Sequence, residues 1–192
     1  MSSLDGIEID PLLFELFASE RRLMPHLHLS LQHGHDLILK RMKRRHSRAQ
    51  AVDLVARLRE RRPDLAVGAD LIAGFPTESE EHHQANLSIL SELKIVHAHI
   101  FPYSPRDTTP AARMPQVDRA TVKARAADLR ALAATTQTGW LASLVDKPLS
   151  VLAERDGSGY AENFARVALP EGMAAGTIAT LTPRAIEGRL LV

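Results

Sequence analysis

The 192-residue sequence contains no cysteine, and aromatic residues make up only 4% of it. The absence of cysteine excludes a disulfide framework, a cysteine-based zinc or iron–sulfur site within this sequence, and a cysteine nucleophile. No apolar run approaches the ~20 residues of a membrane span, and the first thirty residues contain several acids and no signal-peptide pattern. We therefore expect a soluble, cytoplasmic protein without a membrane partner.

The sequence also lacks an overall excess of charge of one sign, since it has 24 basic and 23 acidic residues and a net charge of +1. The distribution is nevertheless uneven. Residues 40–62 contain ten Lys or Arg and only two acids, Asp53 and Glu60. Such a cluster is typical either of a solvated helix face or of a surface that binds phosphates. The sequence alone leaves both interpretations open.

Strand and helix patterns alternate through the first three-quarters of the sequence. Leucines at every second position predict a strand over 24–31, and apolar runs predict strands at 65–72 and 95–101. Helices are expected at 36–42, 47–62 and 118–144, the first capped by Asp36. Thr77 and Glu80 form a capping-box pattern before a further helix. Strands joined in this way pair in parallel, so this part is predicted to be α/β.

The pattern changes after Pro148. Short β-like runs at 149–154, 164–169, 177–182 and 188–192 are separated by glycine and proline. Several short strands in fewer than fifty residues predict a small antiparallel barrel or sandwich. We therefore predict two domains, 1–145 and 146–192.

Three His-x-His pairs, at 26/28, 33/35 and 97/99, indicate a possible site. On a strand, residues i and i+2 point the same way, so the first and third pairs each present two imidazoles on one face. If those faces meet inside a barrel they would suit zinc, iron or nickel, which gives the hypothesis of a metal-dependent hydrolase. The alternative is that they are polar residues lining a cavity. No carboxylate lies at an obvious ligand spacing beside them, so we predict no metal ligand, and we assign no catalytic residue.

A glycine turn at 68–78 joins a buried strand to a capped helix, an arrangement that allows a ligand to approach the backbone closely. Ligands of parallel α/β folds bind at the carboxyl ends of the strands. Residues 32–36, 74–78 and 102–106 all fall at such ends. They are therefore expected to form one rim.

Four segments have a distinctive order and spacing. They are Pro25-His-Leu-His-Leu-Ser-Leu-Gln32, the stretch 36–45, the turn at 68–78, and Phe101-Pro-Tyr-Ser-Pro-Arg106 followed by Thr109-Pro-Ala-Ala-Arg-Met-Pro115. Over about residues 2–144 they resemble the radical S-adenosylmethionine methylthiotransferases, and most closely the MtaB-type enzymes, which modify threonylcarbamoyladenosine beside the anticodon of tRNA. The resemblance implies the C-terminal part of a radical SAM partial (β/α) barrel. Short motifs at 159–164, 176–178 and 188–190 resemble a TRAM domain, a small β-barrel that binds tRNA in this family.

The resemblance implies S-adenosylmethionine as the cofactor and tRNA as the partner. Residues 32–36 would lie near the ribose and methionine parts of the cofactor, and residues 72, 74 and 101–103 near its adenine. The expected cofactor-binding residues are Gln32, His33, Gly34, Asp36, Ile72, Gly74, Pro102 and Tyr103. The expected RNA-binding residues are Lys43, Arg44, Arg45, Arg106 and Arg113. At positions 33 and 35, where the family usually has small residues or an acid, this sequence has histidines.

Enzymes of this family hold a [4Fe–4S] cluster through three cysteines of the radical domain, and a separate N-terminal domain holds a second cluster. This sequence contains none of those cysteines. We therefore expect it to correspond to the C-terminal half of such an enzyme and to be inactive alone. The other half would lie on the same gene or on another polypeptide. The alternative is a non-catalytic tRNA- or RNA-binding module that uses the basic stretch and the small barrel.

Overall fold

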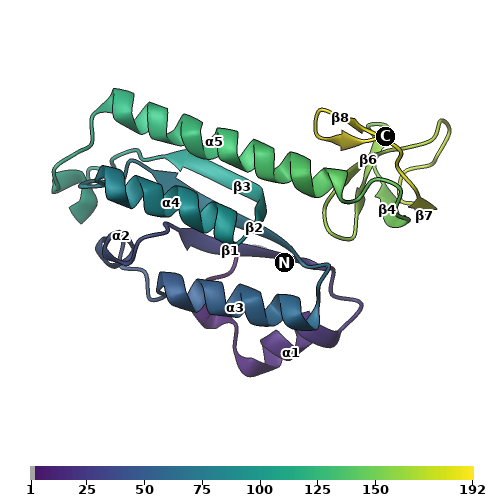
Figure 1. Cartoon of the computed structure of the whole chain (residues 1–192), viewed down its shortest axis with the longest axis horizontal. Helices are drawn as coiled ribbons and strands as arrows, with labels where there is room; N and C mark the ends of the chain where they lie inside the picture. The colour runs from purple at the N-terminus through teal and green to yellow at the C-terminus, as the bar shows by residue number, and fades with distance from the viewer. Residues whose placement is uncertain (1–2) are drawn as a thin grey trace.

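The computed structural model describes residues 3–192 (Figure 1). Its first part contains η1 (Gly6–Glu8), α1 (Pro11–Ser19), β1 (His26–Gln32), α2 (Asp36–Arg41), α3 (Arg48–Arg61), β2 (Ala66–Ala73), α4 (Glu80–Glu92), β3 (Ile95–Pro102), η2 (Pro110–Arg113) and α5 (Arg119–Ala142). Six short strands follow: β4 (Leu149–Ala153), β5 (Ser158–Ala161), β6 (Arg166–Ala168), β7 (Ile178–Leu181), β8 (Ile186–Glu187) and β9 (Leu190–Leu191). Within residues 3–192, no helix has the length and apolarity that a membrane crossing requires.

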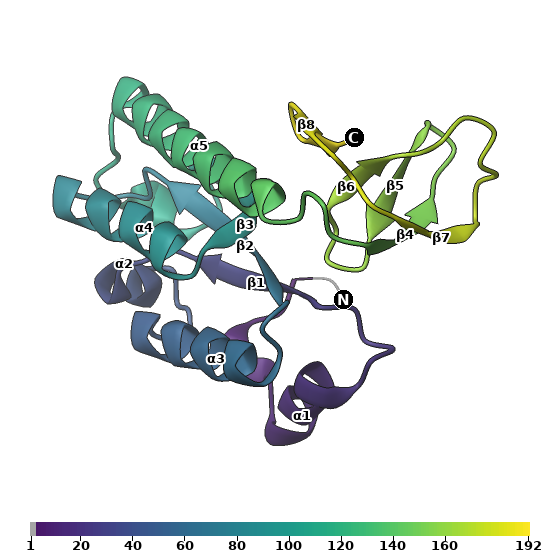
Figure 2. The same cartoon turned by 45° about the vertical axis from the view of Figure 1, so that its right-hand side comes forward.

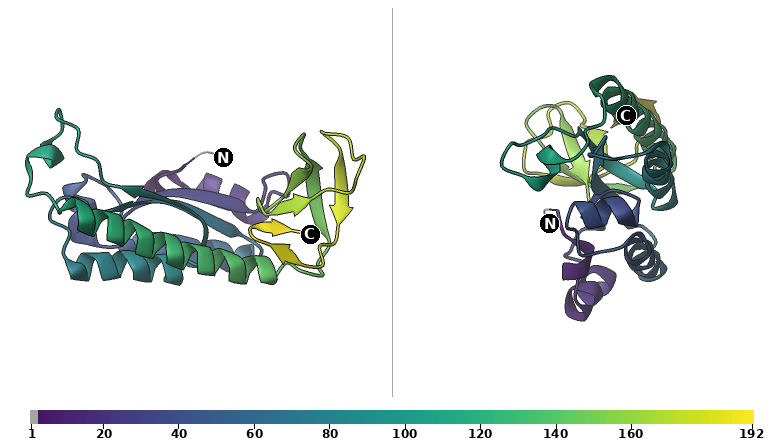
Figure 3. Two further views of the ribbon diagram at one scale, coloured as in Figure 1. Left: turned by 90° about the horizontal axis from the view of Figure 1, so that it is seen from above. Right: turned by 90° about the vertical axis from the view of Figure 1, so that its left-hand side faces the viewer.

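The first part is built on a parallel sheet of order β1-β2-β3, as the alternation of strands and helices predicted. Leu27, Leu29 and Leu31 are almost fully buried on one face of β1, where they belong to the main hydrophobic core. Helices α3, α4 and α5 contribute to that core from the same side (Figure 3). The opposite face of the sheet carries the alternating polar residues of the strands. That polar face is therefore where a site can form.

Two predicted helix caps are wrong by one or two residues. Asp36 is the first helical residue of α2 rather than its cap, because the side chain of His35 accepts the hydrogen bond from Leu37 N. Helix α4 is capped by Ser79, which forms a capping box with His82, rather than by Thr77 and Glu80. Thr77 instead adopts a left-handed conformation (φ 67°) in the turn before the helix. The predicted start of the next helix at residue 47 is confirmed, and in the structure Ser47 is the N-cap of α3.

The second part forms a six-stranded sheet of order β7-β4-β5-β6-β9-β8 around its own small core. The predicted combination of a parallel α/β part and a small all-β part is therefore confirmed. Two details differ from the prediction. Strand β5 was not expected, because the sequence around it is rich in glycine and serine, and β6 pairs with β9 in parallel.

The small sheet lies beside the amino ends of the parallel strands (Figure 2). Phe164, in the turn between β5 and β6, packs its ring against that of His26 with 4.4 Å between the centroids. His97 shares a hydrogen bond of 3.2 Å with the carbonyl oxygen of Asn163, and its ring contacts Trp140 of α5. The two parts thus meet through aromatic and imidazole side chains, and the carboxyl ends of the strands stay at the other end of the molecule.

Candidate cofactor and nucleic-acid site

A cavity of about 660 Å³ lies at the carboxyl ends of the three parallel strands. Residues from the ends of all three strands, from the turn after α2 and from the loop before η2 line it. Of the residues predicted to bind the cofactor or RNA, the cavity brings together Gln32, Ile72, Pro102, Tyr103, Lys43, Arg44 and Arg106. Seven residues that were predicted for two different roles, cofactor binding and RNA binding, therefore line the same cavity. This is the rim that the strand-end argument predicted.

Basic side chains outnumber acidic ones in the lining of the cavity. Arg41, Lys43, Arg44 and Arg106 line it, whereas Asp70 is the only acidic residue among its lining residues. Arg44 is partly engaged, because it pairs with Asp5 and donates a hydrogen bond to the carbonyl oxygen of Ser30. Lys43 and Arg106 are exposed and offer their charge to a ligand. An anionic group, such as a phosphate or a carboxylate, suits these cations.

Apolar and aromatic side chains also line the cavity. Ile72, Phe75 and Phe101 line it, and the rings of Phe75 and Tyr103 meet edge to face with 5.3 Å between their centroids. The Tyr103 hydroxyl is buried and has no hydrogen-bond partner among residues 3–192. A buried polar atom without a partner costs free energy unless a ligand or water satisfies it. A flat aromatic or purine group with a hydrogen-bonding edge fits these walls.

His33 lies beneath the rim and not in the cavity wall. Its side chain is fully buried and shares a 3.2 Å hydrogen bond with Glu78, whose side chain is also fully buried. Burial lowers the pKa of His33. Burial also tends to raise the pKa of Glu78, but the hydrogen bond from His33 and the charge of Arg125 outweigh it and hold that pKa below its usual value.

Glu78 is the centre of a buried polar network. It accepts hydrogen bonds from Gly74 N at 2.9 Å and from Arg125 of α5 at 3.0 Å. The network therefore ties the turn after β2 to the segment after β1 and to α5. Its role is to hold the rim in shape, and sequence spacing gave no sign of it.

The remaining predicted residues also lie outside the cavity wall. Asp36 accepts a hydrogen bond from Arg48 N, and Arg45 pairs on the surface with Glu8. Gly74, in a left-handed conformation (φ 73°), lies where a side chain would collide with Val122 of α5. Arg113 is exposed on η2. The contacts of these residues with cofactor or RNA stay predictions. The residues that line the cavity, in contrast, lie together in one place where a ligand could contact all of them.

Gly34 has a packing role that predicts a measurable effect. A Cβ at this position would lie 2.2 Å from the carbonyl oxygen of Ala85 and 2.7 Å from the side chain of Ile89. We expect Gly34→Ala to lower the free energy of unfolding by about 2–3 kcal/mol in urea denaturation, because the backbone of α4 must shift. Gly139→Ala is the matched control: nothing lies within 4 Å, and it should stabilise α5 by about 0.5–1 kcal/mol. Equal effects of the two changes would contradict this role.

The histidine pairs of β1 and β3 meet on the polar face of the sheet. The rings of His26 and His97 are 5.2 Å apart, and those of His28 and His99 are 4.8 Å apart. Burial, followed by the neighbouring histidines, lowers the pKa of His26 to about 3. A carboxylate does lie beside these histidines, although none has an obvious ligand spacing from them in the sequence. Asp70 of β2 lies between His28 and His99, and sequence spacing missed it because the contact depends on strand register.

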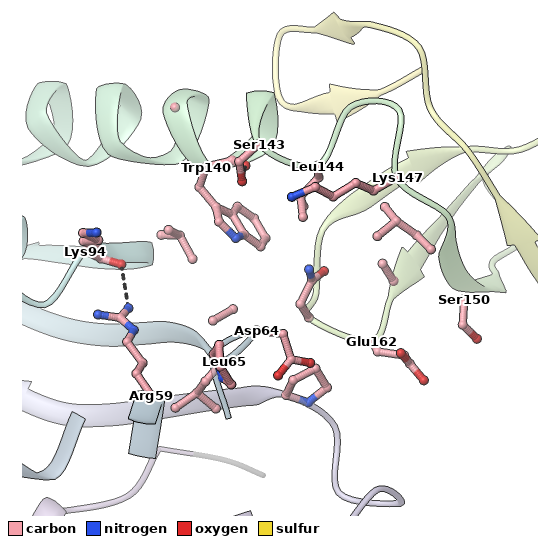
Figure 4. Close-up of a pocket in the computed structure, with 18 of the residues that line it drawn as sticks. Arg59, Asp64, Leu65, Lys94, Trp140, Ser143, Leu144, Lys147, Ser150 and Glu162 are labelled. Carbon is pink, nitrogen blue, oxygen red and sulfur yellow. Dashed lines mark hydrogen bonds between the residues drawn. The ribbon is translucent and has the colours of Figure 1, made fainter. Parts of the chain in front are cut away.

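A second cavity, of about 740 Å³, lies at the opposite end of the strands, between α5 and the small sheet (Figure 4). Trp140 and Lys147 border it, and at one edge Arg59 donates a hydrogen bond to the carbonyl oxygen of Lys94. Residues of the predicted TRAM-like part line it, but none of the residues named individually above as cofactor- or RNA-binding does. The cavity at the carboxyl ends is therefore the stronger candidate.

Comparison with known proteins indicates the family of this chain. The model of the radical SAM superfamily matches residues 3–88. The chain is 43% identical over 178 residues to a protein of Rickettsia prowazekii (strain Madrid E) named threonylcarbamoyladenosine tRNA methylthiotransferase MtaB, a match that covers 93% of this chain and 42% of the relative. It is 41% identical over 138 residues to tRNA-2-methylthio-N(6)-dimethylallyladenosine synthase of Paracoccus denitrificans (strain Pd 1222), covering 72% of this chain and 31% of the relative.

The chain belongs to the radical SAM methylthiotransferase family. The synthase of Orientia tsutsugamushi (strain Boryong) is a further relative, 40% identical over 145 residues that cover 76% of this chain and 32% of that protein. The chain therefore spans less than half the length of each of these relatives.

The family implies two groups, and the residues present fit only one of them. For S-adenosylmethionine, the cavity offers an apolar wall, a buried hydroxyl without a partner and several cations. For a [4Fe–4S] cluster, the donor set does not fit, because such clusters are held by cysteine thiolates and this sequence has no cysteine. No step through a cluster can be assigned to the residues of this chain.

Proposed function

We propose that this chain forms the cofactor- and tRNA-binding part of a tRNA methylthiotransferase, with threonylcarbamoyladenosine beside the anticodon as the target nucleoside. The observation that carries the proposal is the single cavity at the carboxyl ends of β1, β2 and β3, which combines an apolar wall with exposed cations. When bound, S-adenosylmethionine supplies the methyl group of the methylthio product. The chain's own residues bind and orient: Ile72 and Tyr103 face the flat rings, and Gln32 offers an amide at the end of β1.

The threonylcarbamoyladenosine target is supported by the relative named for it, which matches 93% of this chain. The two relatives named above for dimethylallyladenosine match 72% and 76% of it. The 178-residue match of the first relative extends into residues 146–192, because only 145 residues precede them. We propose that these residues act as a TRAM-like RNA-binding domain. Phosphate contacts there and along the basic rim would position the tRNA, while the cavity selects the base.

We further propose that the cluster ligands come from polypeptide outside this sequence, either from the same gene or from another chain. The 192-residue chain by itself would then bind tRNA without catalysing the reaction. The alternative, a non-catalytic RNA-binding module, makes the same prediction for the isolated chain. The two hypotheses differ only in whether a cysteine-containing partner segment exists.

Exchange of Lys43 and Arg106 for alanine tests the role of the rim. We expect the double variant to bind tRNA about tenfold more weakly at 0.1 M salt, because two exposed cations that can neutralise phosphates are lost. The plot of log affinity against log salt should flatten by about 1.4, the contribution of two single-strand phosphate contacts. Filter binding or fluorescence anisotropy over a salt series measures both quantities.

The matched control is the double variant Arg21→Ala with Lys94→Ala. It removes the same charge from exposed positions after α1 and between α4 and β3, away from the cavity at the carboxyl ends. Its affinity and salt slope should stay close to those of the unmodified chain. A loss as large as that of the rim variant would mean that only net charge matters, and the proposal for the rim would fail.

A further inference from the structure

The polar face of the parallel sheet contains a group that the radical SAM assignment does not use. His28 of β1, Asp70 of β2 and His99 of β3 each direct one ligand atom toward the others, and these atoms all lie within 4.8 Å of one another. The Asp70 Oδ1 atom is 3.0 Å from His28 Nε2 and 3.1 Å from His99 Nδ1. Three neighbouring strands therefore bring two imidazoles and one carboxylate to a single point.

We propose that His28, Asp70 and His99 form a binding site for a first-row transition-metal dication, with Zn²⁺ as the best match. Zn²⁺ binds histidine nitrogen and carboxylate oxygen at about 2.0–2.2 Å, so neighbouring ligand atoms of a tetrahedral site are about 3.3 Å apart. The separations of 3.0 and 3.1 Å are close to that value. Two histidines and one carboxylate leave coordination positions open, as in zinc sites that also hold a water molecule or a substrate.

The surroundings hold two of the ligands in place. The ring of His28 lies directly over Gly68 of β2, where a Cβ would come within 2.4 Å of His28 Nδ1. The second oxygen of Asp70, Oδ2, accepts a 2.7 Å hydrogen bond from the Ser3 hydroxyl. Metal-binding carboxylates and histidines are commonly oriented by such second contacts. A site whose ligands are fixed before the metal arrives loses less conformational entropy on binding.

The third ligand is free to adjust. The side chain of His99 is 63% exposed, so its ring can turn to close the remaining distance to His28 without disturbing a packed core. Asp70 also lines the 660 Å³ cavity. A cation held by Asp70 would therefore border the space in which we place the cofactor and the target nucleoside, and its open positions could accept an oxygen or nitrogen atom from an occupant.

The test is titration of the tag-free, chelator-treated 192-residue chain with ZnCl₂ by isothermal titration calorimetry, with Co²⁺ absorption as a second readout. We expect one strong site per chain, and a visible Co²⁺ spectrum typical of tetrahedral coordination. His99→Gln should weaken Zn²⁺ binding at least about tenfold. Because His99 is exposed, this variant should keep its fold, and circular dichroism checks it.

Two further variants distinguish a site formed by these three residues from weak metal binding by histidines elsewhere in the chain. Gly68→Ala keeps every ligand but displaces the ring of His28, and it should also weaken binding about tenfold. His35→Gln removes a histidine outside the group and should leave the affinity unchanged within about twofold.

Two outcomes would overturn the proposal. One is the absence of a strong site, which would mean that the three residues form a hydrogen-bonded group only. The other is equal weakening by His99→Gln and His35→Gln. Neither outcome bears on tRNA binding or on the family assignment.

Discussion

Replacing Glu78 with glutamine is expected to lower the free energy of unfolding by about 3–5 kcal/mol at neutral pH, because the buried guanidinium of Arg125 loses its buried charged partner and keeps only the exposed Glu80. Glu78 also accepts hydrogen bonds from Gly74 N and His33, so the change loosens the turn that shapes the rim. Urea denaturation of the purified chain measures the effect. Loss of cofactor or tRNA binding by this variant would follow from the altered rim.

Glu80→Gln is the matched control, since Glu80 contacts the same guanidinium from a side chain that is 70% exposed. Solvent screens exposed ion pairs, so the effect of Glu80→Gln should be far smaller than that of Glu78→Gln. A cost for Glu78→Gln as small as that for Glu80→Gln would show that the buried network does not stabilise the fold.

The buried pair of His33 and Glu78 should make the stability of the fold depend on pH. The pKa of His33 is lowered by burial and that of Glu78 is lowered by its partners, so the unfolded chain binds more protons than the folded chain. Stability should therefore fall as the pH drops below about 6.5, and more steeply below about 4.5. The difference between the unmodified chain and Glu78→Gln should shrink over the lower range, because protonation removes the same charge that the substitution removes.

Anaerobic reconstitution of the 192-residue chain with iron and sulfide is expected to yield no [4Fe–4S] cluster and no cleavage of S-adenosylmethionine. The physical reason is the missing ligand set: the family holds its cluster through cysteine thiolates, and this sequence has none. Iron analysis, the visible absorption spectrum and chromatography of the cofactor check the prediction. A chain that holds a cluster and cleaves the cofactor by itself would refute the proposed division of roles.

A positive control for this experiment is a methylthiotransferase that contains the cysteine motif, treated in the same way. If the proposed cysteine-containing segment is identified, adding it should restore iron binding. Restoration without any change in tRNA binding would show that the two functions reside in different parts of the enzyme.

The elements of the fold could largely be predicted, because local patterns encode them. The alternation of Leu27, Leu29 and Leu31 predicted which face of β1 is buried, and Ser47 marked the start of α3. The errors arose where two residues compete for one backbone role. His35 and His82 accept amide hydrogen bonds through ring nitrogens, and histidine is not one of the preferred capping residues.

The candidate site could be predicted in outline and not in detail. Parallel strands place their carboxyl ends together, so Gln32, Ile72 and Tyr103 were expected to meet, and they do. Contacts that depend on register could not be predicted. Asp70 lies 42 residues from His28 in the sequence and 29 from His99, and only the pairing of the strands brings it between them. The burial of His33 likewise depends on the path of α4 and α5.

The central claim is that tRNA enters the cavity at the carboxyl ends of the parallel strands. Ultraviolet crosslinking of an anticodon stem-loop to the chain, followed by mass spectrometry of the peptides, tests it most directly. The predicted adducts lie on Phe101 or Tyr103 and on the segment from Gln32 to Arg44, with further adducts between residues 149 and 192. Adducts confined to residues 149–192, or clustered at Trp140 beside the second cavity, would contradict the claim.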